Sequence, residues 1–160
     1  MQTELSWDQF AARPDLAEAG QDLLYQFGVG LAFLSTVRHD GGPRLHPICP
    51  LLVQGRLLAH LIPSAKRDDL HRDPRYALHS FPTDENEDAF YVTGQAAQIA
   101  DETLVRAAVA QFLLERELYA EPPGFADGQF FEFRLGRCLL TRTNGHGDWD
   151  PQHETWAAAN

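Results

Sequence analysis

The sequence lacks the features of a membrane or secreted protein. No apolar run approaches the roughly 20 residues that a helix needs to cross a bilayer. The first residues, Met-Gln-Thr-Glu-Leu-Ser-Trp, are neither basic nor followed by a continuous apolar segment, so no signal peptide is expected. Only two cysteines are present, Cys49 and Cys138, and they do not form a CxxC pair. The sequence therefore predicts a cytoplasmic protein with two reduced, buried thiols.

The common motifs of nucleotide binding and hydrolysis are also missing. Neither GxGxxG nor GxxxxGK[ST] occurs, which argues against a Rossmann or P-loop nucleotide site. No GxSxG or HExxH is present, and the seven histidines are scattered, so neither a serine hydrolase nor a metal centre is expected. Positive charge is scarce as well. A net charge of −10 opposes binding to a phosphate backbone and makes nucleic acid an unfavourable partner.

What is present is the pattern of a globular protein of one domain, covering residues 1–160, with 44% hydrophobic residues. Helical segments are predicted within residues 1–28, where Ser6-Trp-Asp-Gln9 resembles a capping box, and again after Asp101. Six strands are predicted, at 31–37, from Arg44, at 56–62, 76–81, 90–99 and 130–142. Gly94 within the fifth strand indicates a bulge or a close backbone approach. The order predicts an α+β protein built on an antiparallel six-stranded sheet or small barrel with peripheral helices.

One stretch carries the clearest chemical signal. The third predicted strand stops at Pro63, and Ser64 is suited to cap a short helix that Asp73-Pro74 ends. A helix start presents unpaired N–H groups and a partial positive charge, and here Lys66 and Arg67 add cationic side chains. We interpret this as a phosphate site. Ordinary helix capping with solvated charges is the alternative that the spacing alone leaves open.

The succession of short sequence patterns is informative as a set. In order along the chain they are Leu31-Ala-Phe-Leu-Ser-Thr-Val, an Asp-Gly turn, Pro43-Arg44-Leu-His-Pro-Ile, Gly55-Arg-Leu-Leu, Ser64-x-Lys66, Arg72-Asp-Pro-Arg75 and Thr93-Gly94-x-Ala96. This succession resembles the FMN-binding split-barrel family, the pyridoxamine 5′-phosphate oxidase-like proteins and their deazaflavin-using relatives. The resemblance covers residues 27–99 well and the remainder more loosely. It implies a six-stranded split β-barrel.

The resemblance also implies a cofactor site. Such proteins hold the flavin phosphate at the helix after the third strand, lay the second strand along the isoalloxazine ring, and form homodimers with the cofactor at the subunit interface. A basic side chain near the start of the second strand often reaches the cofactor, and the tail of residues 143–160 resembles a tryptophan-containing terminus that closes against the partner subunit. The residues implied are Ser64, Lys66 and Arg67 for the phosphate, His46, Pro47, Ile48 and Cys49 for the ring, Arg44 as the basic side chain, and Trp149 and Trp156 for ring stacking or for filling the dimer interface.

The function implied is that of an FMN-binding oxidoreductase. A reductase that uses the deazaflavin coenzyme F-420 and a non-catalytic flavin- or haem-binding protein are the alternatives. The sequence identifies no catalytic residue and no substrate, because in flavin enzymes the cofactor performs the redox step. The final residues, Trp-Ala-Ala-Ala-Asn, carry no basic motif for a substrate phosphate, so vitamin B6 oxidation is not expected.

Overall fold

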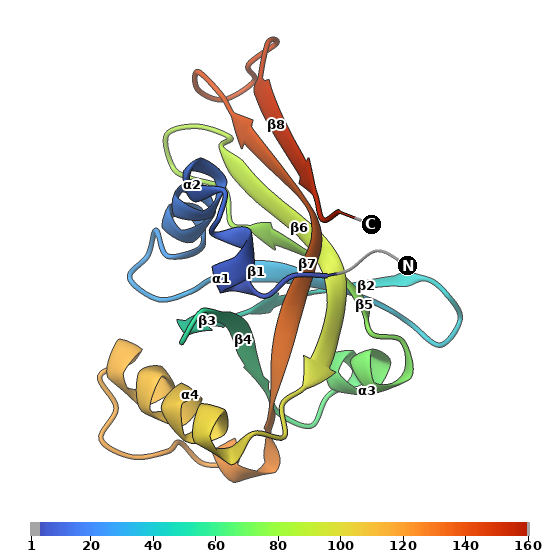
Figure 1. The fold of residues 1–160 in the computed structure, drawn as a ribbon, viewed down its shortest axis with the longest axis vertical. Helices are drawn as coiled ribbons and strands as arrows, with labels where there is room; N and C mark the ends of the chain where they lie inside the picture. The colour runs from blue at the N-terminus through green and yellow to red at the C-terminus, as the bar shows by residue number, and fades with distance from the viewer. Residues whose placement is uncertain (1–3, 160) are drawn as a thin grey trace.

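A computed structural model describes residues 4–159. Four α-helices, one 3₁₀ helix and eight strands follow one another along the described chain (Figure 1). The helices are α1 (Trp7–Phe10), α2 (Pro14–Leu24), α3 (Ala65–Arg72), α4 (Glu102–Glu115) and the 3₁₀ helix η1 (Phe125–Asp127). The strands are β1 (Ala32–Val37), β2 (Pro43–Ile48), β3 (Pro50–Val53), β4 (Arg56–Leu61), β5 (Arg75–Ser80), β6 (Ala89–Gln98), β7 (Gln129–Arg142) and β8 (Gln152–Ala157).

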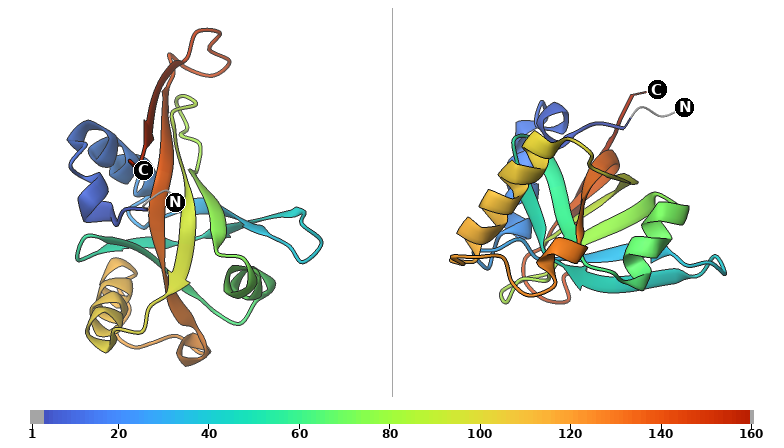
Figure 2. Two further views of the ribbon diagram at one scale, coloured as in Figure 1. Left: turned by 45° about the vertical axis from the view of Figure 1, so that its right-hand side comes forward. Right: turned by 90° about the horizontal axis from the view of Figure 1, so that it is seen from below.

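The strands form one antiparallel sheet in the order β2-β1-β5-β6-β7-β4-β3, with β8 paired to β7. β2 and β3 stand at opposite ends of this order, yet only Cys49 separates them in the chain. The sheet therefore curls back on itself, as a split barrel requires, and the two further views show the curl (Figure 2). The α+β class is confirmed. The predicted count of six strands is too low, because the second strand divides at Cys49 and β8 was not anticipated.

Several local predictions are confirmed by the described residues. Ser6 and Gln9 form the capping box of α1. The Asp101 carboxylate caps α4 by accepting hydrogen bonds from the backbone N–H groups of Thr103 and Leu104. The register between β6 and β7 shifts at Gly94, where an added Cβ would lie 1.9 Å from the Arg134 carbonyl oxygen. Only glycine permits that approach, so the bulge depends on the absence of a side chain there.

The larger of two apolar clusters fills the inside of the curled sheet. Inward side chains of β1, β4, β6 and β7 meet α1 and α2 there, with Leu34, Leu57, Phe90, Phe131 and Phe133 almost fully buried. In Figures 1 and 2, α2 and α3 flank the long strands β6 and β7 on opposite sides. A smaller cluster lies under α4, where Leu104 and Ala108 pack on Leu51, Leu58 and Phe130. In residues 4–159 no helix is long and apolar enough to cross a membrane.

Candidate functional site

The candidate site lies where the ladder between β3 and β4 stops. These strands pair from Val53 opposite Arg56 to Pro50 opposite Ala59. Beyond that point β2 follows β1 instead, and β4 leads through Pro63 and Ser64 into α3. Two large apolar side chains remain exposed on either side of the divergence, Leu45 on β2 (64%) and Ile62 after β4 (54%). A split with exposed apolar edges is the kind of surface that a ligand or a partner covers.

The start of α3 has the geometry of an anion site. Ser64 occupies the N-cap position, but its hydroxyl donates to the Ile62 carbonyl oxygen at 2.8 Å and makes no capping bond to the helix. The first-turn N–H groups of α3 are therefore not satisfied by the N-cap side chain. Lys66 is half-buried and, within residues 4–159, forms no hydrogen bond or ion pair. The terminal Nη1 of Arg67 donates to the Asp127 carbonyl oxygen at 2.9 Å, and its buried Nε has no partner in the described chain.

The other cations of this basic run are already paired. Arg75 forms an ion pair of 2.6 Å with Asp73, which lowers the pKa of that carboxyl group to about 2. Arg72 bonds to Asp69 at 3.2 Å and to the Val37 carbonyl oxygen. Lys66 and Arg67 therefore supply the positive charge at the N-terminus of α3 that no carboxylate in the described chain neutralises.

The carboxylate of Asp69 ties α3 to the first two strands. It is buried and accepts hydrogen bonds from Thr36 at 2.9 Å and from the Nε of Arg44 at 2.6 Å, as well as from Arg72. Burial by itself raises the pKa of Asp69, but the hydrogen bonds from Arg44, Thr36 and Arg72 outweigh it and hold the pKa below its ordinary value. Arg44, which the resemblance places near the cofactor, is thus anchored beside α3 through one nitrogen.

The residues predicted for the ring alternate between two faces of the strand. Ile48 is buried in the core and His46 is half-buried on the same side, whereas Pro47 and Cys49 are exposed on the opposite side. The prediction that Cys49 is buried is wrong, because the alternation places Ile48 and Pro50 inside and leaves Cys49 outside. Cys138 is buried as predicted, and burial raises the pKa of its thiol to about 11.

The two tryptophans of the predicted tail occupy different environments. Trp156 lies on β8, opposite Cys138 on β7, and its ring meets that of Phe10 edge to face at 4.9 Å. Trp149 lies in the loop between β7 and β8 and is fully exposed. This hairpin extends beyond the rest of the sheet (Figure 1). Trp156 is therefore held by its own subunit, and Trp149 is available for contacts outside it.

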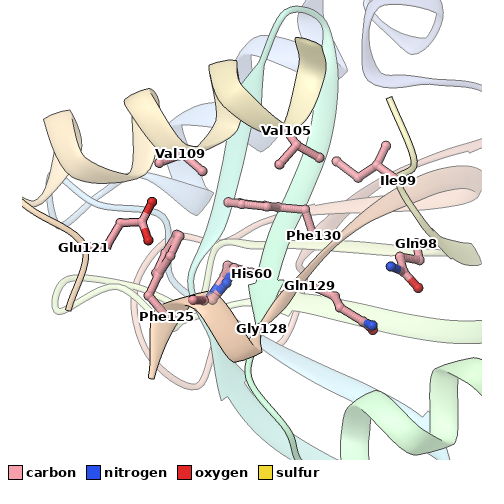
Figure 3. A pocket seen from close by; sticks show the side chains of 11 residues that line it. His60, Gln98, Ile99, Val105, Val109, Glu121, Phe125, Gly128, Gln129 and Phe130 are labelled. Atoms are coloured by element: carbon pink, nitrogen blue, oxygen red, sulfur yellow. The ribbon is translucent and has the colours of Figure 1, made fainter. Parts of the chain in front are cut away.

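A separate cavity of about 270 Å³ lies between the start of α4, η1 and the beginning of β7 (Figure 3). His60 of β4 forms one wall, with its ring stacked on Phe125 at 3.9 Å and an interplanar angle of 8°. Burial lowers the pKa of His60, and the nearby Arg116 charge adds to the effect, while a backbone hydrogen bond at Phe125 opposes it. The imidazole is therefore neutral at pH 7. A Cβ on Gly128 would lie 2.2 Å from this ring, so a side chain there would have to displace the imidazole.

Sequence reasoning considered His60 only as a metal ligand and missed its stacking on Phe125. No local pattern links these two residues, which lie on different elements. In the described part of the chain no cluster of three metal-binding side chains is found. A stronger signal for the anion site was also missed: Lys66 is the only lysine in the chain.

Comparison with known proteins identifies the fold. No family model matches the chain, and no curated protein matches it. Solved structures do match. They include a heme binding protein from Mycobacterium smegmatis (16% identity, TM-score 0.63, covering 87% of this chain and 57% of that one) and an F420 reductase (18%, 0.58, 73% and 94%). A protein of the pyridoxinephosphate oxidase family from Clostridium acetobutylicum also matches (14%, 0.60, 90% and 94%).

These likenesses confirm the predicted resemblance at the level of the fold. The chain has the split-barrel fold, which it shares with the F420 reductase and with the protein of the pyridoxinephosphate oxidase family. It spans 57% of the length of the Mycobacterium protein.

Proposed function

We propose that this chain, which folds as an FMN-binding split barrel, binds FMN and serves as an oxidoreductase. The observation that carries the proposal is the pair of uncompensated cations at the start of α3. Lys66 has no partner in the described chain, and the buried Nε of Arg67 lacks an acceptor. A buried donor without an acceptor costs roughly 1–3 kcal/mol. The Arg67 side chain would have to move to offer this nitrogen to a phosphate oxygen, whereas half-buried Lys66 is accessible to one directly.

The residues present fit a flavin phosphate. The N–H groups of the first turn and the Ser64 hydroxyl supply hydrogen-bond donors, and Lys66 and Arg67 supply charge. The charges of Asp69 and Asp73 are already paired with arginines. Asp68, in the first turn of α3, is exposed and forms no ion pair in the described chain, so the proposal requires its carboxylate to point away from the anion. Arg44 is held beside α3 through its Nε, so its terminal nitrogens are positioned to contribute. The start of α3 is therefore locally positive and complementary to a phosphate, although the protein as a whole has a net charge of −10.

The ring would lie along the backbone of His46, Pro47, Ile48 and Cys49, on the exposed side that Pro47 and Cys49 share. Exposed Pro47 and the apolar edges formed by Leu45 and Ile62 offer a surface for a planar apolar ring. When bound, FMN supplies the electron transfer to or from a substrate. The chain's own part is to hold the phosphate, orient the ring and exclude water from its covered face. No side chain of the site is assigned a catalytic role.

We also propose that the site is completed in a homodimer. A row of side chains crosses the outer face of the sheet, in register from strand to strand: Pro47, Phe33, His79, Tyr91, Leu139 and Thr155. Phe33, Tyr91 and Leu139 are half-buried and Leu45 is exposed nearby. A partner covering this face would bury these side chains and place an exposed Trp149 within reach of a second subunit. Light scattering is expected to give twice the monomer mass, and a monomer with full FMN affinity would contradict the interfacial site.

A deazaflavin reductase is the second candidate. The F420 reductase among the solved neighbours supports it, because coenzyme F-420 also has a phosphate-bearing tail that Ser64, Lys66 and Arg67 would hold. The heme binding neighbour supports a non-catalytic alternative. Haem binding would use the apolar split and not the α3 start, since its recognition does not require a phosphate site.

The experiment that separates these candidates compares the affinities of the same protein for the three cofactors. The purified protein is analysed by absorbance and mass spectrometry for any bound small molecule, then titrated with FMN, coenzyme F-420 and haem. Binding of FMN with the highest affinity, followed by its reduction with nicotinamide donors, is the expected result. Preference for F-420 would replace the first candidate by the second. Binding of haem with no affinity for either flavin would contradict the proposed function.

A further inference from the structure

The buried carboxylate of Asp69 collects donors from three elements of the fold. It is 3% exposed and accepts hydrogen bonds from Thr36 on β1, Arg44 on β2 and Arg72 at the end of α3. One carboxylate thus meets two guanidinium groups, and the cluster keeps an excess of one positive charge. Asp69 therefore fixes the position of its cations without neutralising both of them.

Arg44 is bound in a way that leaves its terminal nitrogens free. Its Nε donates to the Asp69 carboxylate at 2.6 Å. Within residues 4–159 its side chain makes no other hydrogen bond, and this side chain is 28% exposed. The donors of a guanidinium group point in fixed directions, so an arginine held through Nε keeps Nη1 and Nη2 for a second acceptor. The contact with Asp69 determines where these two nitrogens point.

The anchored guanidinium group adjoins the proposed phosphate site. Lys66 precedes Asp69 by three positions in α3, and side chains three apart in a helix are neighbours on one face. Positions one turn apart are separated by about 5 Å along the helix axis. Arg44, held by Asp69, therefore lies beside the helix face on which half-buried Lys66 is found.

We propose that Asp69 is a positioning residue of the flavin site, which orients Arg44 so that its terminal nitrogens meet the phosphate bound by Lys66. This inference rests on the proposed function, because it adds a requirement of the same phosphate site. Charge alone predicts the opposite effect. A carboxylate repels a nearby phosphate, so its removal should strengthen phosphate binding if only charge mattered. Removal of a residue that orients a donor weakens binding, because a preorganised contact is lost.

The test compares FMN with riboflavin, which has the same ring and ribityl chain but no phosphate. The ratio of the two dissociation constants, measured by flavin fluorescence, isolates the contribution of the phosphate. In the wild type we expect FMN to bind about a hundredfold or more tightly than riboflavin, because several charge-assisted hydrogen bonds hold the phosphate. Asp69→Asn offers one neutral acceptor oxygen to three donors. It is expected to reduce the ratio about tenfold and to change the affinity for riboflavin by less than about twofold.

Three further variants separate orientation from charge and from stability. Arg44→Lys keeps the charge but has neither an Nε nor a pair of terminal nitrogens, so it should reduce the ratio by a similar factor. In combination with Asp69→Asn it should cause little further loss, because both changes break the same unit. Asp69→Glu keeps the charge and displaces the carboxylate by one methylene group. It should also reduce the ratio, and it replaces Asp69→Asn in the test if that variant does not fold.

Thr36→Val is the matched control. It removes a different donor of the same carboxylate and leaves Arg44 anchored, so the ratio should stay at the wild-type value although the protein is less stable. A loss in Thr36→Val equal to that in Asp69→Asn would show that Asp69 acts only through the stability of the fold, and would overturn the proposal.

The remaining outcomes distinguish the positioning role from the proposed function. Equal affinity of the wild type for FMN and riboflavin would contradict the phosphate site itself, and the role of Asp69 would fall with it. A wild type that prefers FMN, together with an unchanged or larger ratio in Asp69→Asn or Asp69→Glu, would leave the phosphate site in place and overturn the positioning role alone.

Discussion

The two ends of α3 carry similar charged residues and use them in opposite ways. At the C-terminal end, Asp69, Arg72 and Asp73 are all engaged in ion pairs, and Asp69 joins the helix to β1 and β2. At the N-terminal end, Lys66 and Arg67 meet no carboxylate in the described chain. The comparison shows that a run of basic residues in a sequence is not one functional unit. One half of this run holds the helix in place, and the other half is left available for an anion.

The largest expected effect is on the structural end of the helix. Asp69→Asn removes the charge that compensates Arg44 and Arg72, and it should lower the free energy of unfolding by about 3 kcal/mol, the scale of breaking a partly buried pair. Urea unfolding measures this change in the free energy of unfolding. Asp68→Asn, at the exposed neighbouring position, is the matched control and should cost about 0.5 kcal/mol or less. Equal costs for the two variants would show that Asp69 is not the anchor.

A smaller loss of stability is expected when Thr36, the uncharged residue that bonds to Asp69, is replaced. Thr36 is buried and donates a hydrogen bond to Asp69 from β1. Thr36→Val keeps the volume and removes this one bond to a charged group, so it should lower the free energy of unfolding by about 1.5 kcal/mol. In the background of Asp69→Asn the same change should cost less, because the charged acceptor is gone. A double-mutant cycle with strictly additive effects would contradict the coupling.

The pH dependence of the free energy of unfolding provides a further test of the structural role of Asp69. The pKa of Asp69 in the folded protein lies below its ordinary value of 3.8, so its stabilising contribution is present above pH 3.8. This contribution is lost as the pH falls through the lower folded pKa. The difference in stability between the wild type and Asp69→Asn should therefore be constant near neutral pH and shrink below pH 3.8. Unfolding curves at a series of pH values measure it, and a difference that grows on acidification would reverse the assignment.

Most of the fold was predictable because its elements have strong local signals. The bounds of α3 were predicted correctly from Pro63, Ser64 and Asp73-Pro74, and the bulge at Gly94 followed from a glycine inside a strand. β8 was missed because Gln152–Ala157 is largely polar and lacks the alternation of a half-buried strand. Its position depends on pairing with β7, which is a tertiary contact.

The helix start that carries the candidate site was predictable, but the side-chain pairs around it were not. The sequence identified Ser64, Lys66 and Arg67 as one group, and the structure places them together at the start of α3. It did not reveal that Asp69 reaches Thr36, 33 residues earlier, or that Arg44 would be anchored by the same carboxylate. It also placed the thiol of Cys49 inside, since the phase of β2 depends on the kink between β2 and β3. Side-chain pairs between different elements can be predicted only when the fold is known, whereas the start of a helix can be predicted from the local sequence.

The central claim is tested most directly by removing one positive charge at the start of α3 and one beyond its end, at the first residue of β5. Isothermal titration calorimetry with FMN compares Lys66→Ala with Arg75→Ala, whose arginine is already paired with Asp73. Lys66→Ala should weaken binding by roughly 1.5–3 kcal/mol, about tenfold to a hundredfold, with the free energy of unfolding nearly unchanged. Arg75→Ala should change the affinity by less than about twofold. Equal losses in the two variants, or no loss in either, would contradict the claim that the start of α3 holds the flavin phosphate.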